Sequence, residues 1–173
     1  MQGLNRWHWV IISLTLLFSV AALYYPVRYY SELPPQIPTH FSLTGEPDSW
    51  SEKNLGELLL APLLVLPGAV LLLPLVWWMS TVKDPRQILS LPGKKATEIP
   101  LKIAEQIRGL TITHILIIQM LVSLLVFLIV IGQIMVALGI RTSLGYGSLL
   151  VTMILLGDSI ILIWRLFCLT YRS

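Results

Sequence analysis

The segment from residue 40 to residue 52 gathers one imidazole and three carboxylates: His40, Glu46, Asp48 and Glu52. These side chains are of the types that bind zinc and other divalent cations. Their spacing matches no recognised ligand motif, and an Asp before a tight turn is an ordinary means of stabilising that turn. We therefore expect turn-forming hydrogen bonds and no bound metal, with a metal site built from these four residues as the alternative.

A second chemically notable residue is Asp158, near the middle of the last apolar run. A charge at the centre of a transmembrane helix costs roughly 2.5–3.5 kcal/mol, so this carboxylate must be neutral, paired or hydrated. Arg165 lies seven residues on, nearly on the same helix face but about two turns away. Polar partners are also available along one stripe of the preceding apolar run: Gln119, Ser123 and Gln133. Structural pairing and a role in carrying a proton or substrate are both open for Asp158.

The rest of the sequence carries no signature of catalysis, such as His-Glu-x-x-His, Gly-x-Ser-x-Gly or a phosphate-binding glycine loop. His8 and His114 flank apolar runs, and we interpret both as amphipathic anchors at the inner membrane interface. The single cysteine, Cys168, excludes an internal disulfide and a cysteine-built metal site. We expect no enzymatic activity and no cofactor.

Composition places these residues in a membrane protein. Of the 173 residues, 55% are hydrophobic and only 12% are charged, whereas about a quarter of the residues of a soluble domain are charged. The net charge of +3 is small, and the basic residues gather beside apolar runs, which indicates orientation in a bilayer rather than nucleic-acid binding. We expect the lipid bilayer as a partner and no nucleic acid.

Four apolar stretches are long enough to cross a hydrocarbon core, which needs about 20 helical residues. They are Trp7–Tyr25, Leu58–Met79, His114–Leu138 and Ser148–Leu169. The first could be a secretory signal, because Ser19-Val20-Ala21 resembles a cleavage site. We interpret it as an uncleaved anchor, since the apolar run continues to an aromatic edge. The predicted fold is an all-α integral membrane protein with four transmembrane helices.

Charge asymmetry orients these spans. The segment between the second and third spans is basic and should be cytoplasmic: Lys83, Arg86, Lys94, Lys95, Lys102 and Arg108. The segment between the first two spans has two basic against five acidic residues and should be exported. Both termini are then cytoplasmic in a multi-pass protein of a plasma (inner) membrane. We divide the chain into a first helix pair at 1–79 with an outer loop at 26–57, a cytoplasmic loop at 80–113, and a second helix pair at 114–173.

Two local features refine the helices. Three prolines in the second span, Pro62, Pro67 and Pro74, predict a bent helix rather than a broken one. In the cytoplasmic loop, Thr97 can cap a helix whose apolar residues recur at spacings of four, four and three: Ile99, Ile103, Ile107 and Leu110. We expect an amphipathic helix on the inner leaflet before the third span, with a docking site for a soluble partner as the alternative.

The outer loop holds the most unusual segment, Leu33 to Lys53. Three prolines at 34, 35 and 38 favour an extended approach, Ile37–Phe41 can form a short strand, and residues 44–48 have the glycine and proline chemistry of a turn. Trp50 then has a surface to pack on, and Ser51 can cap the helix that leads into the second span. We expect an ordered loop that covers the outer end of the helices.

The same segment resembles a widespread prokaryotic membrane domain of unknown function, found at the N-terminus of SdpI-type immunity proteins. Its pattern is Leu-Pro, then Ile-Pro-x-His-Phe, then Gly-x-x-Asp-x-Trp and a Lys, and the matching residues are Pro34, Ile37, Pro38, His40, Phe41, Gly45, Asp48, Trp50 and Lys53. The resemblance covers about Leu14 to Pro67, and Ser49 stands where the family commonly has a glycine. It implies a prokaryotic membrane protein related to those that protect a cell from its own secreted killing peptide.

Three hypotheses for function follow. The first is a non-enzymatic membrane protein whose outer loop recognises a secreted peptide or another membrane protein. The second is an accessory subunit of a larger membrane complex, in which the same loop docks on a neighbour. The third is a small proton-linked transporter centred on Asp158. The ligand, the oligomeric state and the physiological process do not follow from the sequence.

Overall fold

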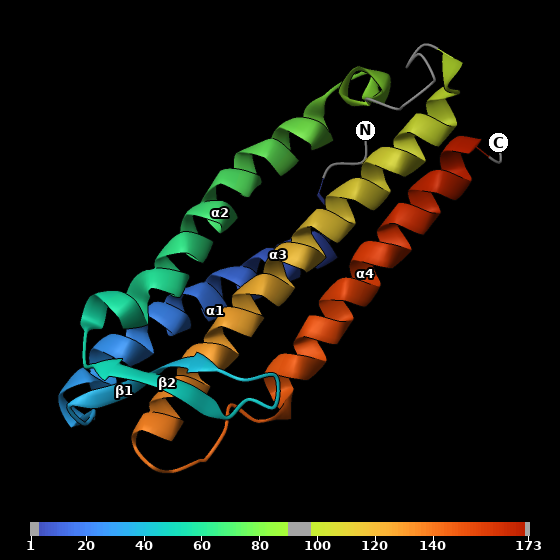
Figure 1. The fold of residues 1–173 in the computed structure, drawn as a ribbon. Helices are drawn as coiled ribbons and strands as arrows, with labels where there is room; N and C mark the ends of the chain where they lie inside the picture. The colour runs from blue at the N-terminus through green and yellow to red at the C-terminus, as the bar shows by residue number, and fades with distance from the viewer. Residues whose placement is uncertain (1–3, 90–97, 172–173) are drawn as a thin grey trace.

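The computed structural model describes residues 4–89 and 98–171. It contains four long helices: α1 (Arg6–Tyr29), α2 (Leu55–Thr81), α3 (Leu101–Ala137) and α4 (Tyr146–Tyr171). A β-hairpin of two strands, β1 (Gln36–Phe41) and β2 (Pro47–Glu52), lies between α1 and α2 (Figure 1). Two 3₁₀ turns, η1 (Tyr30–Glu32) and η2 (Pro85–Ile88), follow α1 and α2. The fold is therefore mostly helical, but the hairpin means that it is not all-α.

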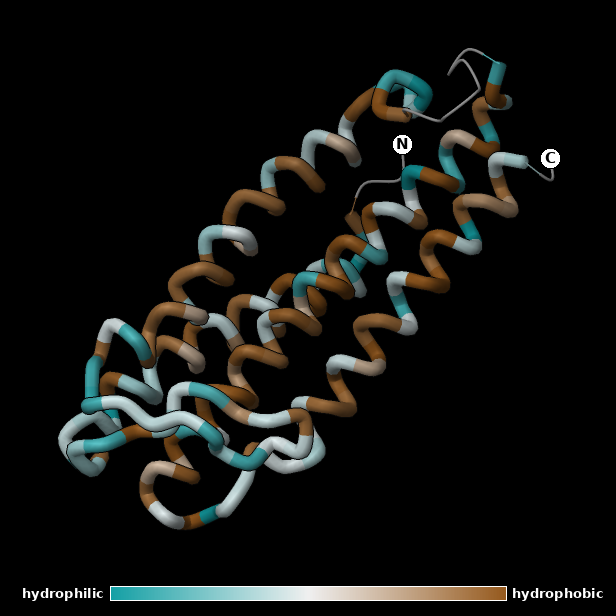
Figure 2. Tube along the Cα trace, in the orientation of Figure 1, coloured by the Kyte–Doolittle hydropathy of each residue, from teal (hydrophilic) through white to brown (hydrophobic). Residues whose placement is uncertain are grey.

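All four helices are long and apolar enough to cross a bilayer. Figure 2 shows hydrophobic residues along the helices and hydrophilic residues concentrated at their ends and in the hairpin. This confirms the prediction of four membrane-spanning helices, and each helix extends beyond the apolar run that predicted it. The protein is a multi-pass membrane protein.

The central element is α3, which packs against α1, α2 and α4. The α1 and α2 helices also contact each other, so α1, α2 and α3 form a three-helix core. In contrast, α4 lies at one edge of the bundle and packs chiefly on α3 (Figure 1). Within the described part of α4, only Val151 and Thr170 are buried. Most of its surface is left for lipid or for another protein.

Asparagine side chains begin the first two helices. Asn5 Oδ1 accepts a hydrogen bond from the His8 backbone N–H at 2.9 Å, and the Asn5 backbone N–H donates to His8 Nδ1 at 3.2 Å, which forms a capping box. Asn54 caps α2 by accepting from the Gly56 N–H at 2.8 Å. The prediction that Ser51 caps this helix is wrong, because Ser51 lies in β2 and its hydroxyl donates to Glu57 Oε2 at 2.8 Å.

The predicted amphipathic helix is not a separate element. Thr97, its expected cap, lies outside the described residues, and Ile103, Ile107 and Leu110 belong to the first turns of α3. This part of α3 packs against η2, and Arg108 within it is 3% exposed. A continuous helix forms because no proline or other breaker separates residue 101 from the third apolar run.

Prolines are accommodated inside both helices of the first pair. The α2 helix continues through Pro62, Pro67 and Pro74 without a break, as expected for prolines in a membrane-spanning helix whose neighbours compensate the lost backbone bonds. The α1 helix likewise continues past Pro26 to Tyr29, four residues beyond the predicted end of its span. Pro26 is buried in the bundle, and the helix continues past it to the aromatic residues beside the hairpin.

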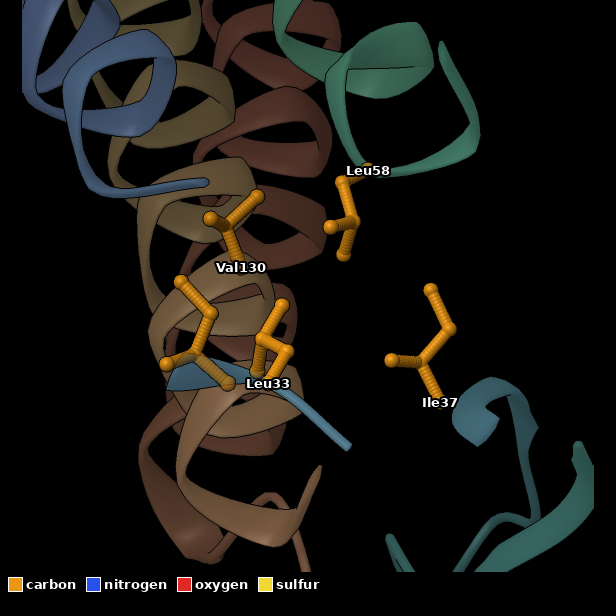
Figure 3. Close-up of a cluster of buried hydrophobic side chains, with 5 residues drawn as sticks. Leu33, Ile37, Leu58 and Val130 are labelled. Carbon is orange, nitrogen blue, oxygen red and sulfur yellow. The ribbon is translucent and has the colours of Figure 1, made fainter. Parts of the chain in front are cut away.

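Two apolar clusters lie at opposite ends of the bundle. One joins Leu33 and Ile37 from the segment around β1 to residues of α2 and α3: Leu58, Val130 and Ile134. Figure 3 shows these side chains converging from the different elements. The other cluster joins α1, α2 and α3 through Ile12, Val76, Ile112 and Leu116. Because Ile37 is fully buried in the first cluster, the hairpin is part of the core rather than a free loop.

Candidate functional site

The hairpin is antiparallel and irregular. Gln36 pairs with Glu52 and Pro38 with Trp50, but the register shifts on either side of His40, as in a β-bulge. A bulge increases twist and re-aims the side chains next to it. The strands are joined by a turn at Gly45, whose φ of 81° is a left-handed conformation that favours glycine. Glycine at this position of the motif is therefore explained by the backbone.

The base of the hairpin is fastened by Lys53. Its ammonium donates hydrogen bonds to the backbone oxygens of Tyr30 at 3.2 Å and Leu33 at 2.9 Å, and it lies 5.0 Å from the centre of the Tyr30 ring. The backbone N–H of Lys53 also donates to Pro35 O at 2.7 Å. Lys53 thus joins the end of β2 to the end of α1, which gives the lysine of the motif a structural role.

The strands and turn of the hairpin are fastened to the second helix pair. Gln133 of α3 donates from Nε2 to Pro38 O at 2.7 Å, and the Leu144 N–H donates to Gly45 O at 2.8 Å. Leu144 approaches α3 at Gly132, where a Cβ atom would stand 2.8 Å from Leu144 Cδ2 and 3.3 Å from its Cα. A side chain at 132 would therefore displace the Leu144 side chain and shift its backbone by a few tenths of an ångström. The hairpin is consequently held at both of its ends.

The hairpin and the neighbouring α3–α4 loop together form what we call the cap, and several of its side chains face outward. Leu43, beside the turn, is fully exposed, and Trp50 on β2 is 47% exposed, so about half of its surface is covered and the rest is accessible. Ile140 and Tyr146 beside the α3–α4 loop are also exposed. A cavity of about 470 Å³ lies between the hairpin turn, α3 and the start of α4, and Leu43, Leu144 and Leu149 line it. The cap thus combines a fixed backbone with exposed apolar side chains.

Of the four metal-ligand candidates, only two are brought together. His40 Nδ1 and Asp48 Oδ1 are hydrogen bonded across the hairpin, with both side chains well exposed to solvent. Among the described residues, no group of three His, Cys, Asp or Glu side chains is close enough to hold a metal ion. Glu46 and Glu52 therefore do not complete a site with this pair, and an exposed pair of this kind contributes about 0–1 kcal/mol.

A second polar site lies inside the membrane. His114 Nδ1 of α3 and Asp158 Oδ1 of α4 are 2.9 Å apart, and both side chains are largely enclosed. Asp158 is twelve residues from the start of α4, which places it about 18 Å along a helix that crosses a core of about 30 Å. The interpretation of His114 as an interfacial anchor is wrong, because it is 6% exposed and pairs across the helix interface.

The Asp158 carboxylate is only partly satisfied. Its Oδ2 atom is buried and has no hydrogen-bond partner among the described residues. A buried oxygen of this kind is costly in lipid, where no bulk water can replace the missing bond. The pair therefore joins α3 to α4 and leaves one acceptor open to a proton, a water molecule or a polar group.

The other intramembrane candidates serve different contacts. Ser123 accepts a hydrogen bond from Ser19 of α1 at 3.1 Å, and Gln133 reaches the hairpin instead of α4. Gln119 lines a narrow gap between α1, α2 and α3. Arg165 is exposed on α4. His114 and Asp158 both lie in predicted spans. Predicting that they pair would have required the positions of α3 and α4 relative to each other along the membrane normal.

His8 is also tied into the bundle rather than free at the interface. Its Nε2 lies 3.1 Å from Thr113 Oγ1, while its Nδ1 accepts from the Asn5 N–H. Since Nδ1 is an acceptor, Nε2 carries the proton and donates to Thr113. Two neighbouring residues of α3 thus make polar contacts with different helices: Thr113 with His8 of α1, and His114 with Asp158 of α4.

Comparison with known proteins finds a family match in the part of the chain that contains the hairpin. Residues 17–66 match a domain family described as a domain of unknown function (DUF1648). Over 80 residues, which are 44% of this chain, the sequence is 34% identical to an uncharacterized protein of Archaeoglobus fulgidus. The matched region covers 42% of that relative, so the chain spans less than half of its length. No solved structure matches the chain. The DUF1648 segment contains the second half of α1, the whole hairpin and the first half of α2.

Proposed function

We propose that this protein is a non-enzymatic membrane protein that recognises a secreted peptide through its outer hairpin. The observation that carries the proposal is the contrast within the cap: its backbone is tied to α1, α3 and the α3–α4 loop, while Leu43 and Trp50 remain exposed. Fixed backbones with exposed aromatic and aliphatic anchors are typical of binding surfaces, because little ordering entropy is lost on binding. The resemblance to SdpI-type immunity proteins supports a peptide as the ligand.

The proposal requires the hairpin to face the outside of the cell. With Cys168 replaced by serine, a cysteine at Ser42 should react with a membrane-impermeant maleimide in intact cells, or in spheroplasts where an outer membrane is present. A cysteine at the exposed Lys83 should react only after lysis. Labelling of Lys83→Cys but not Ser42→Cys in intact cells would reverse the orientation and remove the basis for peptide recognition.

Recognition itself is tested by placing a photo-crosslinking amino acid at Leu43 in cells that make the protein. We expect an adduct with a small secreted peptide, and Trp50→Ala should reduce its yield. A crosslinker at Leu101, which is also an exposed leucine but lies at the opposite end of the bundle and is 53% exposed, is the control. An adduct with an integral membrane protein instead of a peptide would favour the second candidate below, and equal yields at both positions would contradict specific recognition.

The second candidate is an accessory subunit of a membrane complex. It is favoured by α4, whose exposed apolar residues form most of its surface within the described bundle. A crosslinker at Ile160, on the exposed side of α4, should then yield one discrete protein adduct. Under the peptide-recognition proposal the same position contacts lipid and gives none.

A further inference from the structure

A polar cavity lies at the end of the bundle opposite the hairpin. It has a volume of about 350 Å³ and lies between the N-terminus of α1, the end of α2 and the first turns of α3. Its lining includes the side chains of Asn5, His8, Ser80, Glu105 and Arg108. This volume is within the range of about 300–1,000 Å³ that small-ligand sites occupy. The cavity shares no residue with the hairpin, and so it stands apart from the proposed recognition of a peptide.

Both signs of charge meet in this cavity. Arg108 is 3% exposed, and its guanidinium donates to Glu105 Oε2 at 2.6 Å and to Val82 O at 2.7 Å. Glu105 is more exposed, with 44% of its side chain accessible. An anion that approaches Arg108 would be repelled by Glu105, and a cation that approaches Glu105 would be repelled by Arg108. A ligand that carries both charges a few ångströms apart matches the pair.

Neutral polar groups flank the charged pair. His8 has both ring nitrogens engaged, with the Asn5 N–H and with Thr113, so it contributes shape rather than a free donor. Asn5 adds an amide group, and the Ser80 hydroxyl donates to Trp77 O at 2.7 Å, which leaves its oxygen as an acceptor. The lining of the cavity therefore includes neutral donors and acceptors besides the charged pair.

The position of the cavity indicates that such a ligand would be a lipid headgroup. Four exposed tryptophans flank it on α1 and α2: Trp7, Trp9, Trp77 and Trp78. Tryptophan gathers at the level of lipid headgroups, so the cavity opens where headgroups are concentrated. The start of α1 lies beside the end of α2 and the first turns of α3 at this level.

We propose that this cavity binds the phosphoethanolamine group of a membrane phospholipid. The phosphate accepts hydrogen bonds from Arg108 and Asn5, and the ammonium donates to Glu105. Arginine suits phosphate because its planar guanidinium presents several N–H donors. A choline group would carry the same charge, but it has no N–H to donate to Glu105. The chain therefore distinguishes an amine-bearing headgroup from both a choline and an uncharged one.

The experiment measures lipid binding to the purified full-length protein by native mass spectrometry. Phosphatidylethanolamine, phosphatidylcholine and phosphatidylglycerol with the same acyl chains are compared, together with free phosphoethanolamine. We expect phosphatidylethanolamine to bind roughly tenfold more tightly than the other two lipids, the factor that corresponds to one charge-assisted hydrogen bond. Tight binding of free phosphoethanolamine would support the same chemistry and assign the ligand to solution.

Two variants separate the site from general lipid contact. Gly109 lines the cavity, and a Cβ there would meet nothing within 4 Å, so Gly109→Leu should fill the cavity without disturbing the fold. Gly157→Leu on α4 is the matched control, since its Cβ would also meet no atom within 4 Å. We expect Gly109→Leu to abolish the tenfold preference and Gly157→Leu to retain it.

The second variant, Glu105→Gln, removes the negative charge that would pair with the ammonium, keeps a neutral acceptor oxygen, and leaves Arg108 without its anionic neighbour. We expect the preference to move from phosphatidylethanolamine to phosphatidylglycerol. A wild-type protein that binds the three lipids equally, or a preference that survives Gly109→Leu, would overturn the proposal. Thermal unfolding of each variant in the same detergent confirms that the comparison is made on folded protein.

Discussion

The two ends of the helix bundle are built in opposite ways. At one end the hairpin is closed over the helices by Lys53, Gln133 and the backbone of Leu144, and glycines at 45 and 132 allow the close approach. At the other end the helices part around a polar cavity, and Gly109 on its wall has open space where a side chain would be. Both ends hold a cavity, but the one at the hairpin end is lined mainly by apolar side chains, whereas the one at the other end contains the Arg108–Glu105 pair.

This difference shows how the same residue type acts in two settings. A side chain at Gly132 would contact Leu144 in the α3–α4 loop, whereas a Cβ at Gly109 would meet no atom within 4 Å. Loss of packing space is costly in a closed structure because several contacts must move together. The open end has no such coupling. The contrast between the ends therefore predicts unequal responses to equal substitutions.

The largest expected effect is at Gly132. Gly132→Val places a Cβ against Leu144, whose side chain and backbone must both shift, and should destabilise the fold by about 1–3 kcal/mol, the usual range for overpacking. Gly109→Val, the same change at the open end, should alter stability by less than about 0.5 kcal/mol because valine is slightly better than glycine in a helix. Thermal unfolding in detergent measures both. Equal losses at the two positions would remove the distinction between the ends.

A smaller effect is expected at the base of the hairpin. Lys53→Met keeps the aliphatic stem but removes hydrogen bonds to Tyr30 O and Leu33 O, and should cost about 2 kcal/mol. Lys102→Met on the exposed surface of α3 is the control and should be near neutral. Hydrogen exchange of the β1 and β2 amides should increase in the first variant alone. Unchanged protection of the strands would show that Lys53 does not hold the hairpin.

Between the two ends, the His114–Asp158 pair should depend more on hydrogen-bonding capacity than on side-chain size. Asp158→Asn can still accept from His114, whereas Asp158→Leu leaves His114 without its partner, at about 0.6 kcal/mol for a typical bond in lipid and up to about 2 kcal/mol. We expect a higher folded yield for the Asn variant. If Asp158→Asn folds well but is as inactive as Asp158→Leu in a functional assay, proton carriage rather than structure is the role of Asp158.

The smallest effect concerns pH at the open end. Hydrogen bonds from the Arg86 side chain, and next from its backbone N–H, hold the pKa of the Asp84 carboxyl below its ordinary value. A lowered folded pKa stabilises the η2 turn above the ordinary aspartate pKa of about 3.9, and this contribution is lost as the pH falls through the lowered value. Carboxyl ¹³C shifts of Asp84 should titrate at lower pH in the wild type than in Arg86→Gln.

The helices and the outer segment follow from local sequence to different extents. Apolar run length predicts four spans, because each helix must satisfy its backbone bonds within itself. The turn at Gly45 follows from turn chemistry, and the strand at Ile37–Phe41 lies within β1. Ser51 is not the helix cap because β2 continues through it to Glu52, and α2 begins only after Asn54, whose side chain caps it. Such boundaries depend on which of two adjacent polar residues the tertiary structure selects.

Contacts between helices were less predictable. Pairing of His114 with Asp158 depends on the height of α4 against α3, which the docking of Leu144 at Gly132 helps to fix. The cavity depends on where α1 begins relative to the end of α2. Neither relation is contained in the periodicity of one helix. Gln133 shows the same limit, since its stripe on α3 was identified but its partner, Pro38 O, belongs to a different part of the chain.

The length and continuity of α3 make it a mechanical link across the bilayer. It has no proline from Leu101 to Ala137, unlike α1 and α2, and it is the longest of the four helices. Arg108 and Gln133 are separated by 25 residues, close to seven helical turns and roughly 37 Å, so they lie on nearly the same side of the helix. A rotation of α3 that loosens Gln133 from the hairpin would turn Arg108 in the same sense on the opposite face of the membrane.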